Sequence, residues 1–302
     1  MKNIFKKSAL IVLAAAAMTG CIKVIEPQDG TIDVNQVGSA PNAIQNYVDA
    51  VTRSICGKFY FGSSYAYDLG LPAMMLARDV MGQDIVLENS GTEWFSTWYQ
   101  VGTGLGPQYL VCQLPWTYYY AWIDNCNRVL QITGEDPTDA DLRSGAGIAY
   151  TMRAFFYMDL AQMFQYTYVG HEQEGTVPIV TEKTTPTELT NNPRATNEAM
   201  WAFILEDLDK AEKLIADYER SDKYTPDQSV VYGLKARAYL VMENWQQAEY
   251  YAKLAQTGYS VMTESEYLDR EMMQISIFMS ITNVHMNWLP VGGVVEYFKY
   301  HP

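Results

Sequence analysis

The sequence of 302 residues is poor in histidine, in basic residues and in the short motifs of common enzymes. Its three histidines, His171, His285 and His301, form no H-E-x-x-H pattern, and neither G-x-S-x-G nor a P-loop occurs. The sequence therefore carries no signature of a metalloprotease, a serine hydrolase or a P-loop enzyme. Lys and Arg total 21 against 35 Asp and Glu, which gives a formal net charge of −14. A surface this acidic repels phosphate backbones, so no nucleic-acid partner is expected.

Long hydrophobic runs are also missing, since none reaches the roughly 20 residues that a membrane-spanning helix needs. A shorter run at 8–18 follows three lysines and precedes Thr-Gly-Cys21, which is the order of a secretory signal peptide. The residues before Cys21 resemble the lipobox of bacterial lipoproteins, although an ordinary signal peptide with a coincidental cysteine is the alternative. The resemblance implies that residues 1–20 are cleaved off and that Cys21 is acylated, an anchor that is stable with more than one acyl chain. Residues 21–40 lack periodicity and are interpreted as a tether.

Cysteine occurs four times, as Cys21, Cys56, Cys112 and Cys126. The spacing matches no zinc motif such as C-x2-C, so no metal is expected. No other cofactor is expected either. If Cys21 is acylated, three thiols remain, and an odd number excludes a complete disulfide framework. We therefore expect buried thiols.

From residue 41 onward, apolar residues recur every three or four positions, as in amphipathic helices. Hydrophobic residues make up 48% of the chain and charged residues 19%, a composition that excludes a disordered chain. The predicted fold class is mainly all-α, with long irregular loops near 83–106 and 169–193. The expected helices cover 43–56, 71–81, 115–132, 139–164, 197–218, 226–242 and 244–257.

Local signals place the ends of several of these helices. Gly82 follows the second helix, and Pro115 fits the first turn of the third. Thr138 is expected to cap the fourth helix, Thr225 to open the sixth with a capping box, and Asn244 to cap the seventh. The acidic residues expected on the solvated face of the fifth helix are Glu206, Asp207 and Asp209.

The last two expected helices have the spacing of a tetratricopeptide unit, a pair of antiparallel helices whose small residues allow close packing. One unit cannot bury its own apolar face, so further helix pairs should stack against it. The pair at 115–132 and 139–164 is the expected companion. The spacing is carried by Tyr232, Ala236, Tyr239, Ala248 and Ala255.

Aromatic residues are abundant, at 13% of the chain with 23 Tyr and 7 Trp, and the stretch 89–100 concentrates them among amides, hydroxyls and carboxylates. A sugar ring packs its C–H face on an aromatic plane and needs polar partners for its hydroxyls, so this loop is the candidate ligand site. The alternative is that its rings fill a groove between helices. By contrast, the rings at 118–122 point several ways around one helix, and at least half of them are expected in the core. The candidate ligand-binding residues are Asn89, Glu93, Trp94, Trp98, Tyr99 and Gln100.

Six stretches, in order along the chain, resemble the SusD/RagB family of outer-membrane nutrient-binding lipoproteins. The most characteristic is Ala-Tyr-Thr-Met-Arg-Ala-Phe-Phe-Tyr-Met-Asp-Leu at 149–160, followed by Val-Pro-Ile-Val at 177–180. The full set lies at 74–82, 119–130, 149–160, 177–180, 193–196 with 206–208, and 233–240.

The resemblance implies four tetratricopeptide-like units, with a more irregular and mostly C-terminal segment packed against them. It also implies a lipid-anchored protein that faces the cell exterior from the outer membrane, with a SusC/RagA-like TonB-dependent transporter as its partner. Such a protein captures oligosaccharide or polysaccharide without cleaving it, so no catalytic residue is assigned. In starch-binding relatives, aromatic residues after the counterpart of Arg78–Gly82 stack on glucose, which carries over loosely to Trp94 and Trp98.

Three other functions stay open. The RagB branch binds peptides, and only the Trp-rich loop favours a glycan. A glycoside hydrolase could pair Asp79 with Asp84, or Glu88 with Glu93, but the pairing depends on geometry that a sequence does not give. A scaffold that holds a partner protein on its repeats would bind no small ligand.

The SusD-like helical repeat domain is expected to cover residues 41–269. After Arg270 the sequence changes character, with four methionines in a stretch that has few charges. Family members are considerably longer, and we interpret residues 270–302 as a truncated or frameshifted tail. A short natural chain whose tail folds over the last repeat is the alternative.

Overall fold

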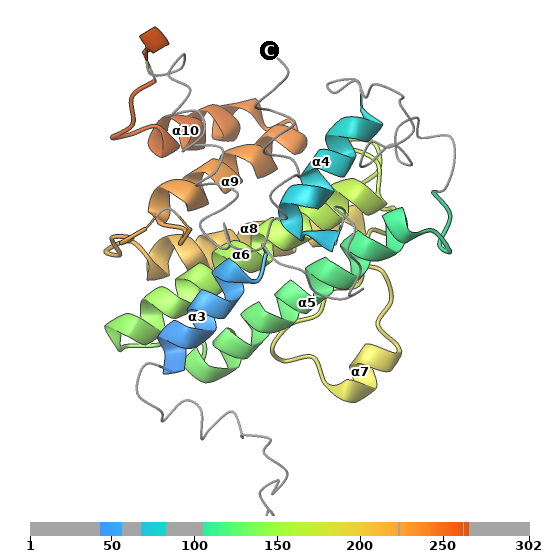
Figure 1. Ribbon diagram of the computed structural model, residues 1–302, viewed down its shortest axis with the longest axis horizontal. Helices are drawn as coiled ribbons and strands as arrows, with labels where there is room; N and C mark the ends of the chain where they lie inside the picture. The colour runs from blue at the N-terminus through green and yellow to red at the C-terminus, as the bar shows by residue number, and fades with distance from the viewer. Residues whose placement is uncertain (1–42, 56–67, 83–104, 223, 262, 266–302) are drawn as a thin grey trace, which may run out of the picture. The chain divides into compact units, whose positions relative to one another are not determined.

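Two long helices, α5 (Leu110–Thr133) and α6 (Ala140–Phe164), lie at the centre of the fold. The computed structural model describes residues 43–55, 68–82, 105–222, 224–261 and 263–265 (Figure 1). A short connection joins the two helices, and short connections between helices give antiparallel neighbours. Gly134 ends α5 with a φ of 72°, a conformation that glycine adopts without strain.

The other helices pack in layers against this pair. α3 packs on both α5 and α6, α8 packs on α6, α9 packs on α8, and α10 pairs with α9. The described part of the chain contains helices and one isolated antiparallel bridge, between Gly175 and Thr196, so the predicted all-α class is confirmed. The further elements are α3 (Ala43–Arg53), α4 (Leu71–Met81), α7 (Pro186–Thr190), α8 (Asn197–Leu214), α9 (Gln228–Val241) and α10 (Trp245–Ala255).

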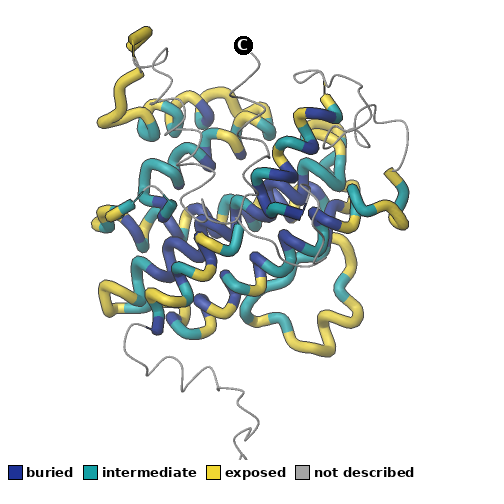
Figure 2. The backbone as a smooth tube through the Cα atoms, in the orientation of Figure 1, coloured by how far each residue is buried: buried dark blue, intermediate teal, exposed yellow. Residues whose placement is uncertain are grey.

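The core is richest in aromatic rings where α5 meets α6, and buried backbone follows α5, α6 and α8 (Figure 2). Tyr118, Tyr119 and Trp122 of α5 are at most 1% exposed. The Trp122 ring lies 5.4 Å from Phe156 of α6, and its indole N–H donates to the carbonyl of Ser54. Because Tyr120 alone of these four rings is half-buried, the prediction that at least half of them belong to the core is confirmed.

Two predicted helix boundaries, the end of α4 and the start of α10, are confirmed, and a single residue determines each. The backbone N–H of Gly82 bonds the carbonyl of Arg78 and closes α4. The side chain of Asn244 accepts from the backbone N–H of Gln247 and opens α10.

Three other predicted starts are wrong. α5 begins at Leu110, so Pro115 lies inside the helix rather than in its first turn. A proline inside a helix loses one backbone hydrogen bond, and burial with its apolar neighbours outweighs that loss here. α6 is capped by Asp139, whose carboxylate accepts from two backbone N–H groups, and not by Thr138. α9 is capped by Asp227, because the backbone of Thr225 is already held in a turn by the side chain of Asp222.

α6 and the end of α8 approach each other most closely at Gly147. A Cβ added there would lie 2.2 Å from Cγ2 of Ile215 and 3.2 Å from Cβ of Leu214. We expect Gly147→Ala to lower the free energy of unfolding by about 1–3 kcal/mol, because the packed helices would have to separate. Urea denaturation measures the difference.

Gly233, inside α9, is the matched control for this substitution. A Cβ at Gly233 meets nothing within 4 Å, so Gly233→Ala should raise stability by about 0.5–1 kcal/mol. Equal stability of the two variants would show that the α6–α8 contact is looser than described.

Cys126 of α5 is fully buried, and burial raises the pKa of its thiol, as expected for a core cysteine. Cys112 is half-buried, and neither of these two thiols forms a disulfide. Among the residues the structure describes, no helix combines the length and apolar character needed to cross a bilayer.

Candidate functional site

The predicted ligand-binding loop lies outside the described residues. This applies to all six of its candidates, to the acylation site Cys21 and to the tail at 270–302. Of the carboxylates considered for hydrolysis, Asp79 alone is described, and it is exposed on α4. The ligand-binding assignment therefore stays a prediction. The six candidates are Asn89, Glu93, Trp94, Trp98, Tyr99 and Gln100.

The clearest surface site is a pair of rings one turn apart on α5, Trp116 and Tyr120, which we call the aromatic shelf. Their centroids are 5.0 Å apart, and both rings are half-buried. Phe164, at the end of α6, meets the Trp116 ring edge-on at 5.3 Å and fixes its plane. The shelf opens into a hollow of about 140 Å³, whose other walls are Pro178, Val180, Leu189 and Asn192.

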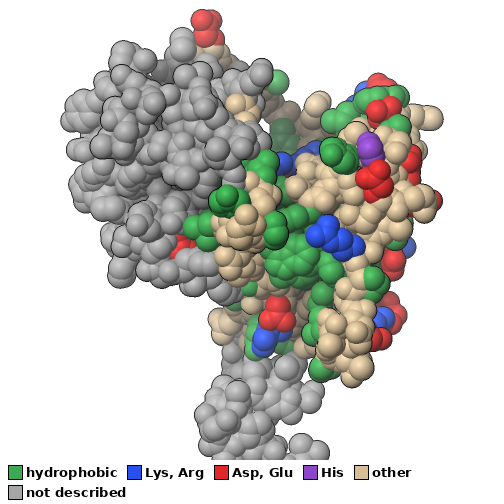
Figure 3. All heavy atoms as spheres, turned by 90° about the vertical axis from the view of Figure 1, so that its right-hand side faces the viewer, with side chains coloured by type: hydrophobic (Ala, Val, Ile, Leu, Met, Phe, Trp, Pro, Cys, Tyr) green, Lys and Arg blue, Asp and Glu red, His purple; other side chains and the backbone are tan. Residues whose placement is uncertain are grey.

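A larger hollow of about 580 Å³, which we call the polar hollow, adjoins the shelf and shares Asn192 with it. α7 forms one wall, held at its start by a capping box between Thr185 and Glu188. Figure 3 shows one face on which hydrophobic side chains gather among polar and charged ones. Hydroxyl, amide and charged groups thus stand beside an apolar plane. The lining residues of the polar hollow are Ile179, Thr181, Lys183, Thr184, Thr187, Glu188, Asn191, Asn192 and Pro193.

Segment 177–182 forms the floor between the two hollows, and side-chain hydrogen bonds hold its backbone. The hydroxyl of Tyr120 donates to the carbonyl of Pro178 at 2.6 Å. Tyr157 bonds Val180 twice: its hydroxyl donates to the carbonyl at 2.9 Å and accepts from the N–H at 2.7 Å. Burial raises the pKa of the Tyr120 hydroxyl, and the positive charge of Arg194 opposes that rise. Both tyrosines therefore act as neutral anchors.

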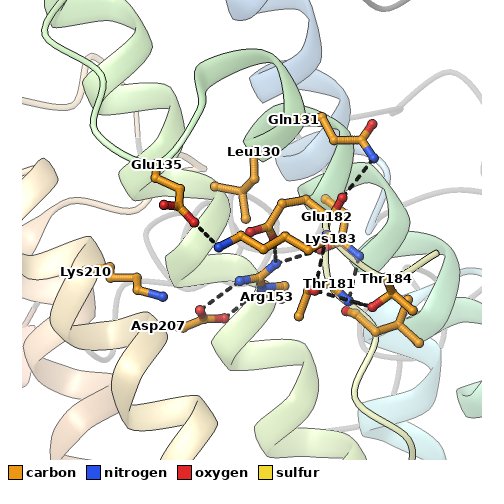
Figure 4. A network of polar contacts seen from close by, with 12 residues as sticks. Leu130, Gln131, Glu135, Arg153, Thr181, Glu182, Lys183, Thr184, Asp207 and Lys210 are labelled. Atoms are coloured by element: carbon orange, nitrogen blue, oxygen red, sulfur yellow. Dashed lines mark hydrogen bonds and ion pairs between the residues drawn. The ribbon is translucent and has the colours of Figure 1, made fainter. Parts of the chain in front are cut away.

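Beneath this segment lies a buried network centred on Arg153 of α6 (Figure 4). Two of its nitrogens donate to the two oxygens of Asp207 at 2.8 and 2.9 Å. Its remaining terminal nitrogen donates to Asn127 at 2.7 Å and to Glu182 at 2.5 Å, which joins the segment to α5, α6 and α8. Burial alone would lower the pKa of Arg153, but Asp207 and Glu182 raise it above its usual value. The guanidinium therefore stays charged.

Asp207 corrects one sequence expectation. It was expected on the solvated face of α8, yet its carboxylate is fully buried, because the charge of Arg153 compensates for its desolvation. Burial raises the pKa of Asp207, and Arg153 opposes the rise. Glu206 remains exposed, in an ion pair with Lys210 of its own helix.

Sequence reasoning missed the shelf, although a signal was present. Trp116 and Tyr120 are four residues apart, a spacing that puts two side chains on one face of a helix. The misplaced start at Pro115 left Trp116 at the edge of the expected helix. Asn192 carried no sequence signal, because only the fold brings it beside α5.

The sequence model of a family described as starch-binding and associating with the outer membrane matches residues 76–240. That is more than half of the chain. The chain belongs to the SusD-like family. A SusD-like carbohydrate-binding protein of Bacteroides vulgatus is 29% identical, with a TM-score of 0.66, over 74% of this chain and 46% of that protein. The match confirms the resemblance that the six stretches indicated, and the family is associated with the outer membrane.

Two further SusD-like structures have the same fold. One is a SusD superfamily protein of Bacteroides fragilis, 24% identical with a TM-score of 0.59, over 74% of this chain and 51% of that one. The other is a laminarin-binding SusD-like protein, 18% identical with a TM-score of 0.55, over 74% and 45%. The chain thus spans about half the length of its solved SusD-like relatives.

A separate similarity covers a short stretch. Over 39 residues, the chain is 64% identical to the phosphatidylserine decarboxylase proenzyme of Amoebophilus asiaticus. The matched stretch is 13% of this chain and 17% of that protein. The proenzyme of Phocaeicola vulgatus is 55% identical over 38 residues, 13% of this chain and 17% of the relative. So short a match attributes no decarboxylase activity to a SusD-like chain.

Proposed function

We propose that this SusD-like protein binds oligosaccharide or polysaccharide at the cell surface and does not cleave it. Family membership supports the proposal, and the observation that carries it within the structure is the aromatic shelf beside the polar hollow. Trp116 supplies a plane for the C–H face of a sugar, and Asn192 supplies an amide for its hydroxyls. Segment 177–182 is already held by hydrogen bonds, so little ordering would oppose binding.

The remaining parts of the proposal concern the surroundings of the protein. Acylation of Cys21 would anchor it in the outer membrane, facing the exterior, and a SusC-like TonB-dependent transporter would receive the ligand. One sugar on one shelf should bind weakly, with a Kd near the millimolar range, or about −4 kcal/mol. A polymer would gain by contacting the shelf and the predicted Trp94–Trp98 loop together.

Native affinity electrophoresis of the full chain in mild detergent tests the function. Laminarin belongs in the panel because one solved relative binds it, and starch belongs because the family is described as starch-binding. Retardation without shortening of the polymer would support a binding protein and exclude a hydrolase. Retardation by no polymer, neutral or acidic, would overturn the proposal and leave a peptide ligand of the RagB type as the next candidate.

Trp116→Ala tests the shelf. We expect it to weaken binding of the retarding polymer about tenfold, equivalent to about 1.4 kcal/mol, because one stacking plane is lost. Trp116→Phe should retain most of the binding, since it keeps a ring.

Trp245→Ala is the matched control, because Trp245 lies on α10 and is 61% exposed. It should leave retardation unchanged. A Trp116→Ala protein that melts like the parent and is retarded equally would remove the shelf from the site.

A further inference from the structure

Three charged side chains from three helices lie together: Asp159 of α6 and the arginines Arg78 and Arg237. The carboxylate of Asp159 is fully buried, and Oδ2 accepts a hydrogen bond of 2.7 Å from the hydroxyl of Tyr119. Oδ1 lies 3.6 Å from Nη1 of Arg78 on α4 and 3.9 Å from Nη2 of Arg237 on α9. Both separations exceed a hydrogen bond, and Oδ1 has no hydrogen-bond partner among the described residues. The carboxylate thus attracts both guanidinium groups without satisfying their donors.

The charge at this cluster is unbalanced. Arg128, which is also exposed, has its own acid four residues earlier, Asp124. Arg78 and Arg237 have no acidic residue three or four positions away on either side. Among the residues that the structure describes, one aspartate therefore faces two arginines, which leaves one positive charge in excess at this point of a chain whose net charge is −14.

Both arginines also reach solvent. The side chains are 35% exposed at Arg78 and 47% exposed at Arg237. A guanidinium carries five N–H donors and matches the paired oxygens of a carboxylate or a sulfate. Because both arginines lie within 3.9 Å of the same oxygen, a single anionic group can contact both.

We propose that Arg78 and Arg237 bind an acidic substituent of the glycan, the carboxylate of a uronic acid or a sulfate ester, with Asp159 holding the two guanidinium groups in place. The inference rests on the proposed glycan-binding function and narrows its substrate class to acidic polysaccharides. Tyr119 supports the geometry, because its hydroxyl fixes Oδ2 and turns Oδ1 toward the arginines.

Affinity electrophoresis of the full chain in polygalacturonate and in dextran sulfate, with dextran and laminarin as neutral polymers, tests this inference. Near-physiological salt screens non-specific attraction, and the net negative charge of the protein opposes it. We expect retardation by at least one acidic polymer, and the polymer that retards distinguishes carboxylate from sulfate. Arg78→Gln and Arg237→Gln should each weaken that retardation at least tenfold.

Arg128→Gln is the matched control, because it removes the same charge from an exposed arginine and should change nothing. Arg78→Lys keeps the charge and should retain part of the binding, which separates loss of the anion contact from loss of the fold. Melting curves of all variants complete that comparison.

The outcomes separate the two proposals. Retardation by laminarin but by neither acidic polymer would overturn this inference and leave the glycan-binding function standing. Acid-polymer retardation that survives both glutamine substitutions would also overturn it. Retardation by no polymer at all would overturn both.

Discussion

Replacing Arg153 with methionine will lower the free energy of unfolding by about 3–5 kcal/mol. The substitution leaves the carboxylate of Asp207 buried without its bidentate partner and removes the bond to Glu182. The rings of Tyr150 and Phe203, each 5.2 Å from the guanidinium, cannot replace its charge. Urea denaturation followed by circular dichroism measures the loss.

Two companion variants separate charge from packing. Arg128→Met breaks an exposed pair within one helix and should cost less than about 0.5 kcal/mol. Arg153→Met combined with Asp207→Leu should recover part of the loss, because no buried charge is then left uncompensated at that position. A single Arg153→Met protein as stable as the parent would mean that the buried network contributes no stability.

Trp122→Ala should be comparably damaging, at about 3–5 kcal/mol. Trp122 is 1% exposed, and its ring packs against Tyr118, Tyr119 and Phe156 at centroid distances of 5.1 to 5.5 Å. Removal leaves a cavity between α5 and α6 and deprives the carbonyl of Ser54 of its donor.

Trp245→Ala serves again as the control, since an exposed tryptophan should change stability by less than about 0.5 kcal/mol. Comparison of the two denaturation midpoints checks the prediction. Similar midpoints would contradict the prediction, because they would mean that the cavity left by Trp122→Ala closes without loss of stability.

What the sequence could predict was mostly local. Helix positions followed from apolar spacing, and ends such as Gly82 and Asn244 followed from one residue each. Trp201, Ile204 and Leu208 are all buried and recur three or four positions apart along α8, as apolar spacing predicts for one face of a helix. Periodicity predicts such features because it depends on neighbours within a few turns.

Features that depend on distant residues could not be predicted. Arg153 and Asp207 are 54 residues apart, and the acidic run in which Asp207 lies has the pattern of a solvated face. The meeting of Arg78 with Arg237 likewise needs three helices to be in place. Only at the shelf did a local signal go unused, in the spacing of Trp116 and Tyr120.

α6 carries both Arg153, beneath segment 177–182, and Asp159, between the two arginines. They lie six positions apart on one uninterrupted helix, about 9 Å along its axis. A continuous buried helix hardly stretches, so the folded protein holds the two proposed contact points at a constant separation. A polymer that uses both must present its apolar face and its acidic group at that separation, and selection would then depend on the repeat length of the glycan as well as on its charge.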